Sequence, residues 1–192
     1  SLHDALPISR QYLADQMGVT LDDLEQLVFS NAFGMRAQRG EISAKQHWKT
    51  IQQRFGLDEK GLKDFRRDFF GGDVLDRELL NYIHTLRSQY KIGLLSNAFS
   101  DLRTYLENSW SIADLFDDLV ISAEVGLVKP DAKIFLLTLE RLGVQPGEAV
   151  FIDDFLHNID GARAVHMNTV HFQNPGQARQ DLEAILSKGR SE

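Results

Sequence analysis

The sequence predicts an α/β fold, in which a Rossmann-like parallel sheet flanked by helices follows a small helical domain. From residue 76 onwards, short apolar runs alternate with amphipathic stretches, a pattern typical of strands joined by right-handed helical crossovers. Before the paired glycines Gly71 and Gly72, the chain shows only helical periodicity. The two patterns therefore predict a helical bundle in the first two fifths of the chain and a sheet domain in the rest.

Four short helices are expected in the first part. One covers residues 11–17, and the others begin at Thr20, Ser43 and Asp58, whose side chains can cap a helix N-terminus. Gly56 and then the paired glycines provide the stops. The apolar stripe of the last helix is interpreted as core packing and consists of Leu62, Phe65 and Phe69.

The paired glycines also mark the natural hinge between the two parts, although a plain helix stop explains them equally well. We expect a helical domain over residues 10–72 and an α/β domain over residues 73–192.

Residues 1–9 form a separate segment. They lack helical or strand periodicity and resemble the translation of a DNA sequencing adapter, so we expect native sequence to begin near Arg10. A native disordered tail is the alternative.

The sheet domain is expected to begin with a helix that Asp76 caps. Its apolar side chains should face inward, and they are Leu79, Leu80, Ile83 and Leu86. Strands are then predicted at residues 91–95, 119–122, 149–153 and 169–172. The helices that alternate with them are predicted at residues 101–110, 131–142, 158–166 and 177–186.

Composition excludes several classes of function. The formal net charge is −7, which disfavours a nucleic-acid partner. The chain has 0 cysteines, which excludes disulfides, a thiolate metal site and a cysteine nucleophile and fits a reducing cytoplasm. No apolar run approaches the roughly 20 residues of a membrane span. We therefore expect a cytoplasmic protein without a nucleic-acid or membrane partner. The sequence does not indicate the oligomeric state.

The most basic stretch covers residues 60–68. Its four cations are Lys60, Lys63, Arg66 and Arg67, and Asp64 and Asp68 are interleaved with them. Mixed charges at helical spacing indicate a solvated helix face rather than a phosphate-binding patch.

Three polar signals follow apolar strand-like runs. They are Ser96 with Asn97, then Lys129, and then the adjacent pair Asp153 and Asp154. Because ligands of parallel sheets bind at the carboxyl ends of the strands, these side chains are expected to gather at one edge. A hydroxyl, an ammonium group and a carboxylate pair together are suited to binding phosphate. Oxygen-only ligands without nearby His or Cys favour Mg²⁺ between the two acids, which would otherwise repel each other.

Each signal also has a plainer interpretation. Ser96 and Asn97 are typical of a turn or helix cap, and Lys129 could be an exposed lysine before a helix. Asp154 could cap a helix while Asp153 forms a salt bridge.

In this order, three segments resemble the haloacid dehalogenase-like (HAD) hydrolase superfamily, in the subfamily IA-like branch that has a helical cap before its second motif. The segments are LLSNAFSDLR, ISAEVGLVKPDAKIF and AVFIDDFLHNIDGARAVHM, and the resemblance is best over residues 75–172. It covers the sheet domain, and the helical part fits the cap by position and size.

The resemblance implies a Mg²⁺-dependent phosphatase that acts on a small phosphorylated metabolite through an aspartyl-phosphate. In this family an aspartate on the first strand attacks phosphorus, and a second aspartate two residues later acts as general acid and base. By resemblance, Ser96 and the Asn97 backbone hold the phosphoryl oxygens, and Lys129 steadies the nucleophile and the transition-state charge. Asp154, supported by Asp153, matches the metal ligands. The cap normally selects the substrate. Arg36, Arg39 and Trp48 are possible cap contacts, although surface or core roles are favoured.

The chain departs from the family pattern at its first motif. A strand ending in Asp-x-Asp should precede the cap, but Asp4 follows no apolar strand and Asp15 lies in a helical stretch. We assign no nucleophile. In the family that strand is central, between the strands predicted at 91–95 and 149–153. We therefore expect these two strands to lack a shared partner and this chain to be inactive and marginally stable.

Three other functions stay open. A metal-independent 2-haloacid dehalogenase would use the same nucleophile on carbon, but the acid pair argues against a carboxylate substrate. A phosphoacceptor module of the response-regulator kind uses similar residues in a different order. The third is a non-catalytic HAD-like protein whose role is to bind other proteins.

Overall fold

The computed structural model describes residues 7–72 and 75–188, with side chains from Arg10 onward. Most of the opening segment, residues 1–6, lies outside the described residues, while residues 7–9 form the first turn of helix α1 (Pro7–Met17). Within the described ranges, no helix is both long enough and apolar enough to cross a bilayer.

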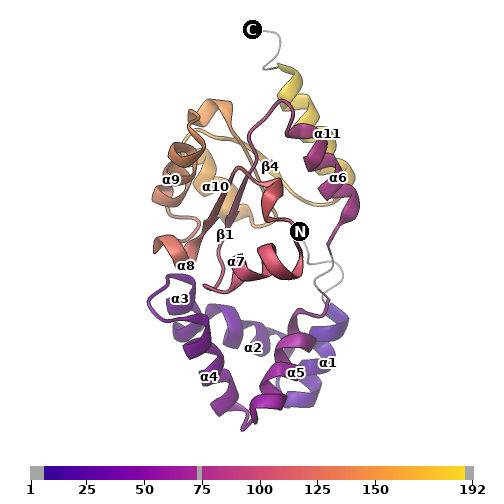
Figure 1. Ribbon diagram of the computed structural model, residues 1–192, viewed down its shortest axis with the longest axis vertical. Helices are drawn as coiled ribbons and strands as arrows, with labels where there is room; N and C mark the ends of the chain where they lie inside the picture. The colour runs from indigo at the N-terminus through magenta and orange to yellow at the C-terminus, as the bar shows by residue number, and fades with distance from the viewer. Residues whose placement is uncertain (1–6, 73–74, 189–192) are drawn as a thin grey trace.

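Helices α1 to α5, which we call the cap helices, pack together at one end of the molecule (Figure 1). After α1 they are α2 (Leu21–Glu25), α3 (Ala32–Gln38), α4 (Ala44–Arg54) and α5 (Glu59–Phe70), and a π-helical turn (Gln26–Ser30) extends α2. The predicted caps are confirmed: the side chains of Thr20, Ser43 and Asp58 each accept a hydrogen bond from the backbone N–H three residues later.

The bundle contains one helix more than the four we expected. Helix α3 was missed because no apolar stripe marks it. Asn31 caps it by accepting a 2.7 Å hydrogen bond from the Gly34 N–H. Gly34 lets α3 approach the preceding turn, since a Cβ there would lie 2.6 Å from the Val28 carbonyl oxygen.

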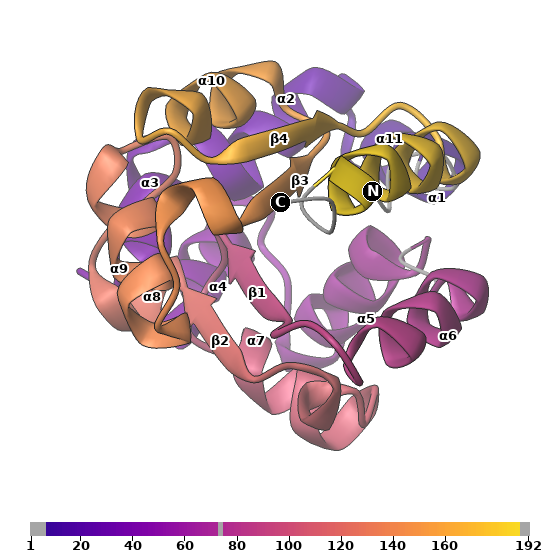
Figure 2. The ribbon, with the colours of Figure 1, turned by 90° about the horizontal axis from the view of Figure 1, so that it is seen from above.

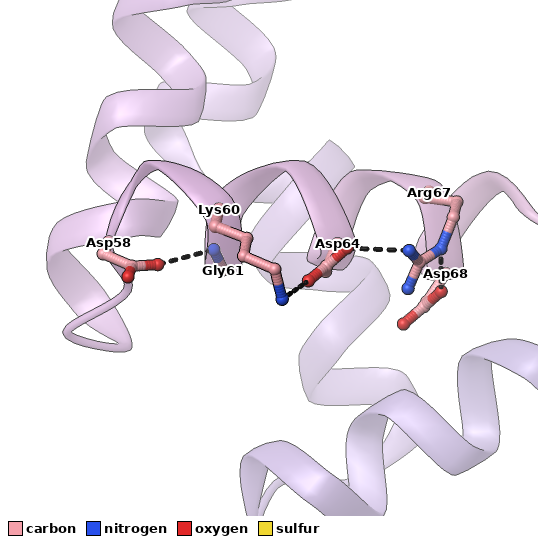
Figure 3. Close-up of polar contacts among 6 residues, drawn as sticks. All are labelled: Asp58, Lys60, Gly61, Asp64, Arg67 and Asp68. Carbon is pink, nitrogen blue, oxygen red and sulfur yellow. Dashed lines mark hydrogen bonds and ion pairs between the residues drawn. The ribbon is translucent and has the colours of Figure 1, made fainter.

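The cap helices enclose a closed hydrophobic core. Its largest fully buried members are Leu24, Val28, Ile51, Phe65 and Phe69. The rings of Phe65 and Phe69 stack with their centroids 6.1 Å apart, as expected of a core stripe. The outer face of α5 is polar, and Figure 3 shows Asp64 paired with both Lys60 and Arg67 along it. The basic stretch is therefore a solvated face, as expected.

The sheet domain contains all the predicted strands. They are β1 (Gly93–Ser96), β2 (Asp118–Ile121), β3 (Val150–Asp153) and β4 (Asn168–His171). The helices are α6 (Arg77–Leu86), α7 (Leu102–Thr104, extended by a π-helical turn, Tyr105–Ser109), α8 (Ser122–Val125), α9 (Ala132–Leu142), α10 (Leu156–Ala164) and α11 (Pro175–Lys188). Short 3₁₀ turns cover Ala113–Leu115 and Pro146–Glu148. Helix α8 corrects one prediction, because Ser122 begins a helical turn and does not end a strand.

The strands form two separate two-stranded parallel sheets. Strand β1 pairs with β2, from Gly93 opposite Asp118 to Ser96 opposite Ile121. Strand β3 pairs with β4 in the same way. Figure 2 shows β3 and β1 as the inner strands, with β4 and β2 outside them. Within the described residues, no strand pairs with the inner edge of either. The α/β fold class is confirmed.

Helix α6 corrects a second prediction. Its N-cap is as expected, since Asp76 accepts a 2.9 Å hydrogen bond from the Leu79 N–H. Its apolar stripe, however, is not buried: no residue of the helix is buried and Leu79 is 40% exposed. An amphipathic pattern identifies which face of a helix is apolar, but it does not supply the surface that covers that face.

Candidate active site

Lys129 lies at the centre of the predicted site, where two loops join. Its backbone N–H donates to the Asn97 side-chain oxygen at 2.8 Å, and its carbonyl accepts from the Asn97 amide nitrogen at 3.0 Å. This pair of hydrogen bonds ties the loop before α9 to the carboxyl end of β1. The Lys129–Pro130 peptide bond is cis. Asn97 therefore positions Lys129 through its side chain, a role that its place after a strand did not reveal.

The ammonium group of Lys129 reaches the end of the other sheet. Its Nζ lies 2.6 Å from Oδ2 of Asp153, and the two side chains are only 10% and 7% exposed. Nζ also lies 5.4 Å from the centre of the Phe151 ring. Because the pair is largely removed from water, each charge is stabilised by the other. Removal of one partner alone would leave an uncompensated buried charge, which is strongly destabilising.

The second oxygen of Asp153 is also engaged. Its Oδ1 accepts hydrogen bonds from the Phe155 backbone N–H and from the Asn158 side-chain nitrogen, both at 2.9 Å. Asn158 is 3% exposed, and its own side-chain oxygen has no hydrogen-bond partner among the residues the structure describes. Asp153 is thus a fixed acceptor that holds Lys129 and the first turn of α10.

The other predicted residues sit at the same ends of the strands. Ser96 is the last residue of β1, one position before Asn97. Asp154 directly follows β3, and its backbone carbonyl oxygen lies 2.9 Å from Nε2 of His171. The hydrogen bonds join Asn97, Lys129 and Asp153 into one network, and Ser96 and Asp154 adjoin its members in the chain.

Two further residues support this network, and one of them, Ser122, was not singled out from the sequence. Ser122 is fully buried and exchanges two hydrogen bonds with the backbone of Ala98, which fixes the loop after Ser96. Gly161 lets α10 pack onto the Lys129 loop, since a Cβ there would lie 2.7 Å from the Pro130 carbonyl oxygen. A serine directly after a buried strand was the available signal for Ser122.

The loop after β1 also joins the cap helices to the site. Phe99 is buried within the hydrophobic core of the cap helices, with its ring 4.7 Å from that of His47. Ser100 accepts a hydrogen bond from the Ala44 N–H, and Asp101 forms a 2.8 Å ion pair with Arg66 of α5. A displacement of the cap helices would therefore act on the loop that follows Ser96.

Burial lowers the pKa of His47 below its ordinary value, and the Val28 backbone and the charge of Asp101 oppose this less strongly. His47 is fully buried, and neither ring nitrogen makes a well-formed hydrogen bond within the described part of the chain. A neutral imidazole is therefore favoured at this junction.

The possible cap contacts named from the sequence lie elsewhere. Trp48 is 2% exposed and belongs to the hydrophobic core of the cap helices. Arg36 pairs with Glu41 on the surface at 3.2 Å, and Arg39 is also at the surface. His157, next to the acid pair, is exposed and lies against Phe155.

A Mg²⁺ site needs several oxygen ligands that are free to coordinate the ion. Carboxylate oxygens are suitable ligands, but both oxygens of Asp153 already accept hydrogen bonds. Among the described side chains, no group of three or more His, Cys, Asp or Glu could hold a metal ion. In this arrangement the described residues do not form a magnesium site by themselves.

Comparison with known proteins identifies the class. A family model described as haloacid dehalogenase-like hydrolase matches residues 5–166. The chain belongs to this family of hydrolases. Two solved structures show the same fold. One is a predicted HAD-like family hydrolase from Porphyromonas gingivalis, with a TM-score of 0.75 at 22% identity over 93% of this chain and 89% of that chain. The other is a HAD family enzyme from Bacteroides thetaiotaomicron in complex with magnesium and inorganic phosphate, with a TM-score of 0.72 at 20% identity over 90% and 87%.

Curated relatives include named phosphatases. D-ribitol-5-phosphate phosphatase of Bacteroides thetaiotaomicron is 27% identical over 157 residues, which are 78% of this chain and 76% of that protein. The chain spans less than a third of the length of several other relatives. Among these is mouse acyl-CoA dehydrogenase family member 10, which is 42% identical over 71 residues, 37% of this chain and 7% of that protein.

Proposed function

We propose that this chain carries the phosphoryl-binding half of a HAD phosphatase site that acts on a small phosphomonoester. The network that joins Asn97, Lys129 and Asp153 carries the proposal, because it holds a largely buried ammonium group at the carboxyl ends of β1 and β3. The relatives named as phosphatases support the same reaction class. A cytoplasmic site of action belongs to the proposal as well.

The residues would divide the work as follows. The Ser96 hydroxyl and the backbone N–H groups after it would donate to phosphoryl oxygens, and Lys129 would neutralise the charge that develops on them. Asp153 would orient Lys129. Asp154 would contribute a carboxylate to Mg²⁺ only when further oxygen ligands complete the set, because Asp153 is already occupied by hydrogen-bond donors.

The reaction also needs a nucleophile, which we do not find in this sequence. We propose that the chain by itself does not turn over phosphomonoesters. By analogy with other covalent catalysts, loss of the nucleophile lowers the rate on the order of a million-fold. Phosphatase activity at ordinary enzyme rates, measured with p-nitrophenyl phosphate and Mg²⁺ and compared with the same assay in chelator, would contradict this.

Phosphate binding tests the proposal without turnover. We expect inorganic phosphate to bind the 192-residue chain in a titration followed by NMR, with amide shifts around Ser96 and Lys129. Lys129→Met should abolish the binding. The matched control is Lys133→Met, an exposed lysine on α9. Ser96→Ala, which leaves the ion pair intact, provides a second variant and should weaken binding. Equal binding by the wild type and all variants would refute the assignment.

A further inference from the structure

The segment of residues 96–101 belongs to the candidate site at one end and to the cap helices at the other. Its first residue, Ser96, ends β1. Its last three residues contact the cap helices before the chain enters α7, at the boundary between the two regions (Figure 1). One short stretch of chain therefore has to fit both parts of the molecule.

Phe99 places an aromatic ring from the sheet domain inside the hydrophobic core of the cap helices. The residue is 5% exposed. Its ring centroid lies 4.7 Å from that of His47, 5.7 Å from that of Trp48 and 6.0 Å from that of Phe29. Every other buried residue of this core, within the described part of the chain, comes from residues 13–69. Because rings at these separations have preferred orientations, the cap helices determine how the Phe99 ring lies.

The two residues after Phe99 fasten the segment to two different cap helices. The Ser100 hydroxyl accepts a 3.2 Å hydrogen bond from the Ala44 N–H, which lies in the first turn of α4. Such N–H groups have no acceptor within their own helix. Asp101 forms a 2.8 Å ion pair with Arg66 of α5, and both side chains are half-buried. Contacts to two helices fix the orientation of the segment as well as its position.

The end of the segment that lies in the site is also held. The Ala98 N–H donates to the Ser122 hydroxyl at 3.0 Å, and the Ala98 carbonyl accepts from the same hydroxyl at 3.2 Å. The Asn97 side chain is bound to the Lys129 backbone by two hydrogen bonds. Peptide units are planar, and consecutive Cα atoms lie about 3.8 Å apart. A displacement of the next residue, Phe99, therefore reaches the site with little slack.

We infer that Phe99 is a positioning residue: its ring, held in the hydrophobic core of the cap helices, fixes the shape of the loop of residues 96–98. The inference rests on the proposed function, which assigns this loop to phosphate, and it gives the cap helices a part in phosphate affinity. Coupling between two sites is reciprocal. Phosphate bound at Ser96 should alter the packing around Phe99, and a change in that packing should alter phosphate affinity.

Tryptophan fluorescence reports this coupling. The chain contains 2 tryptophans, and Trp110→Phe leaves only Trp48, whose ring meets the Phe99 ring edge-on. In this background we expect inorganic phosphate to shift the Trp48 emission with the same midpoint as the amide shifts around Ser96. The reverse variant, Trp48→Phe, leaves Trp110 as the reporter and should give no shift. An unchanged Trp48 emission while the Ser96 amide shifts would overturn the inference.

Two substitutions in the same core separate positioning from stability. Phe99→Leu keeps an apolar side chain but loses the aromatic contacts, and it should weaken phosphate binding about tenfold, within the range typical of coupled sites. The matched control is Phe65→Leu, since Phe65 is 2% exposed in the same core and its ring contacts Phe55 and Phe69. It should keep wild-type affinity at a temperature where circular dichroism shows both variants folded. Equal phosphate affinities in the two variants would show that Phe99 has only a structural role.

A second pair of variants tests the coupling without phosphate. Ser122→Ala removes the hydroxyl that holds the Ala98 backbone, and it should shift the Trp48 emission of the phosphate-free Trp110→Phe chain. Thr138→Val removes another buried hydroxyl, from α9, and should leave the emission unchanged. Equal emission spectra in the two variants would contradict a link between the loop and the cap helices.

The outcomes distinguish this inference from the proposed function. If phosphate does not bind the wild type but Ser122→Ala shifts the Trp48 emission, the coupling stands and the proposed function fails. If phosphate binds but neither phosphate nor Ser122→Ala shifts the emission, the inference fails alone. If Ser122→Ala does not fold, the phosphate-free amide resonances of residues 96–98 decide in its place. They should move in Phe99→Leu and not in Phe65→Leu, and identical resonances would refute the coupling.

Discussion

The cap helices and the two sheets differ in how completely they bury their apolar residues. In the cap helices, Leu24, Ile51 and Phe69 are fully buried, and each lies on a stripe that faces the other helices. In the sheet domain, several apolar side chains of the inner strands and of α6 remain partly exposed to water. Both regions contain leucine, isoleucine and phenylalanine, so the difference lies in the surfaces that cover these side chains.

A helix satisfies its own backbone, and its apolar stripe needs only some other apolar face. A strand depends on a neighbour at each edge, and that neighbour can lie far away in the sequence. The cap helices therefore form a closed core, to which the loop after β1 adds Phe99, whereas β1 and β3 each pair with one strand among the described residues. Stability is expected to follow this division.

Matched isoleucines should show the largest difference. Ile51 of α4 is fully buried, whereas Ile152 of β3 is 38% exposed. Ile51→Ala is expected to lower the free energy of unfolding by about 2–5 kcal/mol, through lost burial and a cavity. Ile152→Ala should cost less, about 1–2 kcal/mol, because more than a third of the residue stays in contact with water. Denaturant unfolding measures both.

Equal losses at the two positions would show that the inner strands are as well packed as the cap helices.

Two glycines of the sheet domain provide the next comparison. A Cβ on Gly161 would lie 2.7 Å from the Pro130 carbonyl oxygen and 2.9 Å from the Pro130 Cβ, whereas a Cβ on Gly147 meets nothing within 4 Å. Gly161→Ala should destabilise by about 1–2 kcal/mol, since overpacking exceeds the gain in helix propensity. Gly147→Ala should be neutral or slightly stabilising.

The readout for this pair is thermal unfolding together with phosphate binding. Gly161→Ala should also weaken phosphate binding, because it shifts the loop that holds Lys129. A stabilised Gly161→Ala variant would show that α10 does not depend on this close approach.

Local signals predicted most of the secondary structure. The caps at Thr20, Ser43 and Asp58 depend on residues within one turn, and all three are present. Helix α3 was missed because no apolar stripe marks it, and its close approach to the preceding turn at Gly34 has no local signal in the sequence. The inward face predicted for α6 is only partly buried, with Leu79 exposed and the other three apolar side chains half-buried, because full burial requires a covering surface that no pattern within α6 can reveal.

The site was predictable in part. The order of the motifs predicted that strand ends would supply Lys129 and the acid pair. The structure joins Lys129 to Asp153, but Lys129 lies in the loop between α8 and α9 and not at the end of a strand. The sequence could not predict that the Asn97 side chain would bind the Lys129 backbone, or that the Asn158 side chain would donate a hydrogen bond to Asp153. Those contacts depend on how loops from different strands meet, which single-sequence periodicity does not encode.

The pH dependence of stability probes the junction between the two regions. Burial lowers the pKa of His47, so below about pH 6.5 the unfolded chain binds a proton that the folded chain rejects. Stability should therefore fall as the pH decreases from 6.5, by at most about 1.4 kcal/mol per pH unit from this group. His47→Phe should flatten the profile between pH 7 and 5, measured by denaturant unfolding.

His157→Phe is the control, since that histidine is exposed. It should leave the pH profile unchanged. An unaltered profile in His47→Phe would show that groups other than His47 set the acid sensitivity.

The smallest effect is expected on the outer face of α5. The pKa of Asp64 is lowered, first by its hydrogen bond from Lys60 and also by the charges of Lys60 and Arg67 (Figure 3). Exposed ion pairs contribute little to stability because water and salt screen them. Lys60→Gln should leave the thermal midpoint unchanged within error, while NMR titration shows the pKa of Asp64 moving up toward that of a free aspartate. A clear loss of stability would mean that this face is not simply solvated, and that the closed core of the cap helices depends on surface charge as well as on burial.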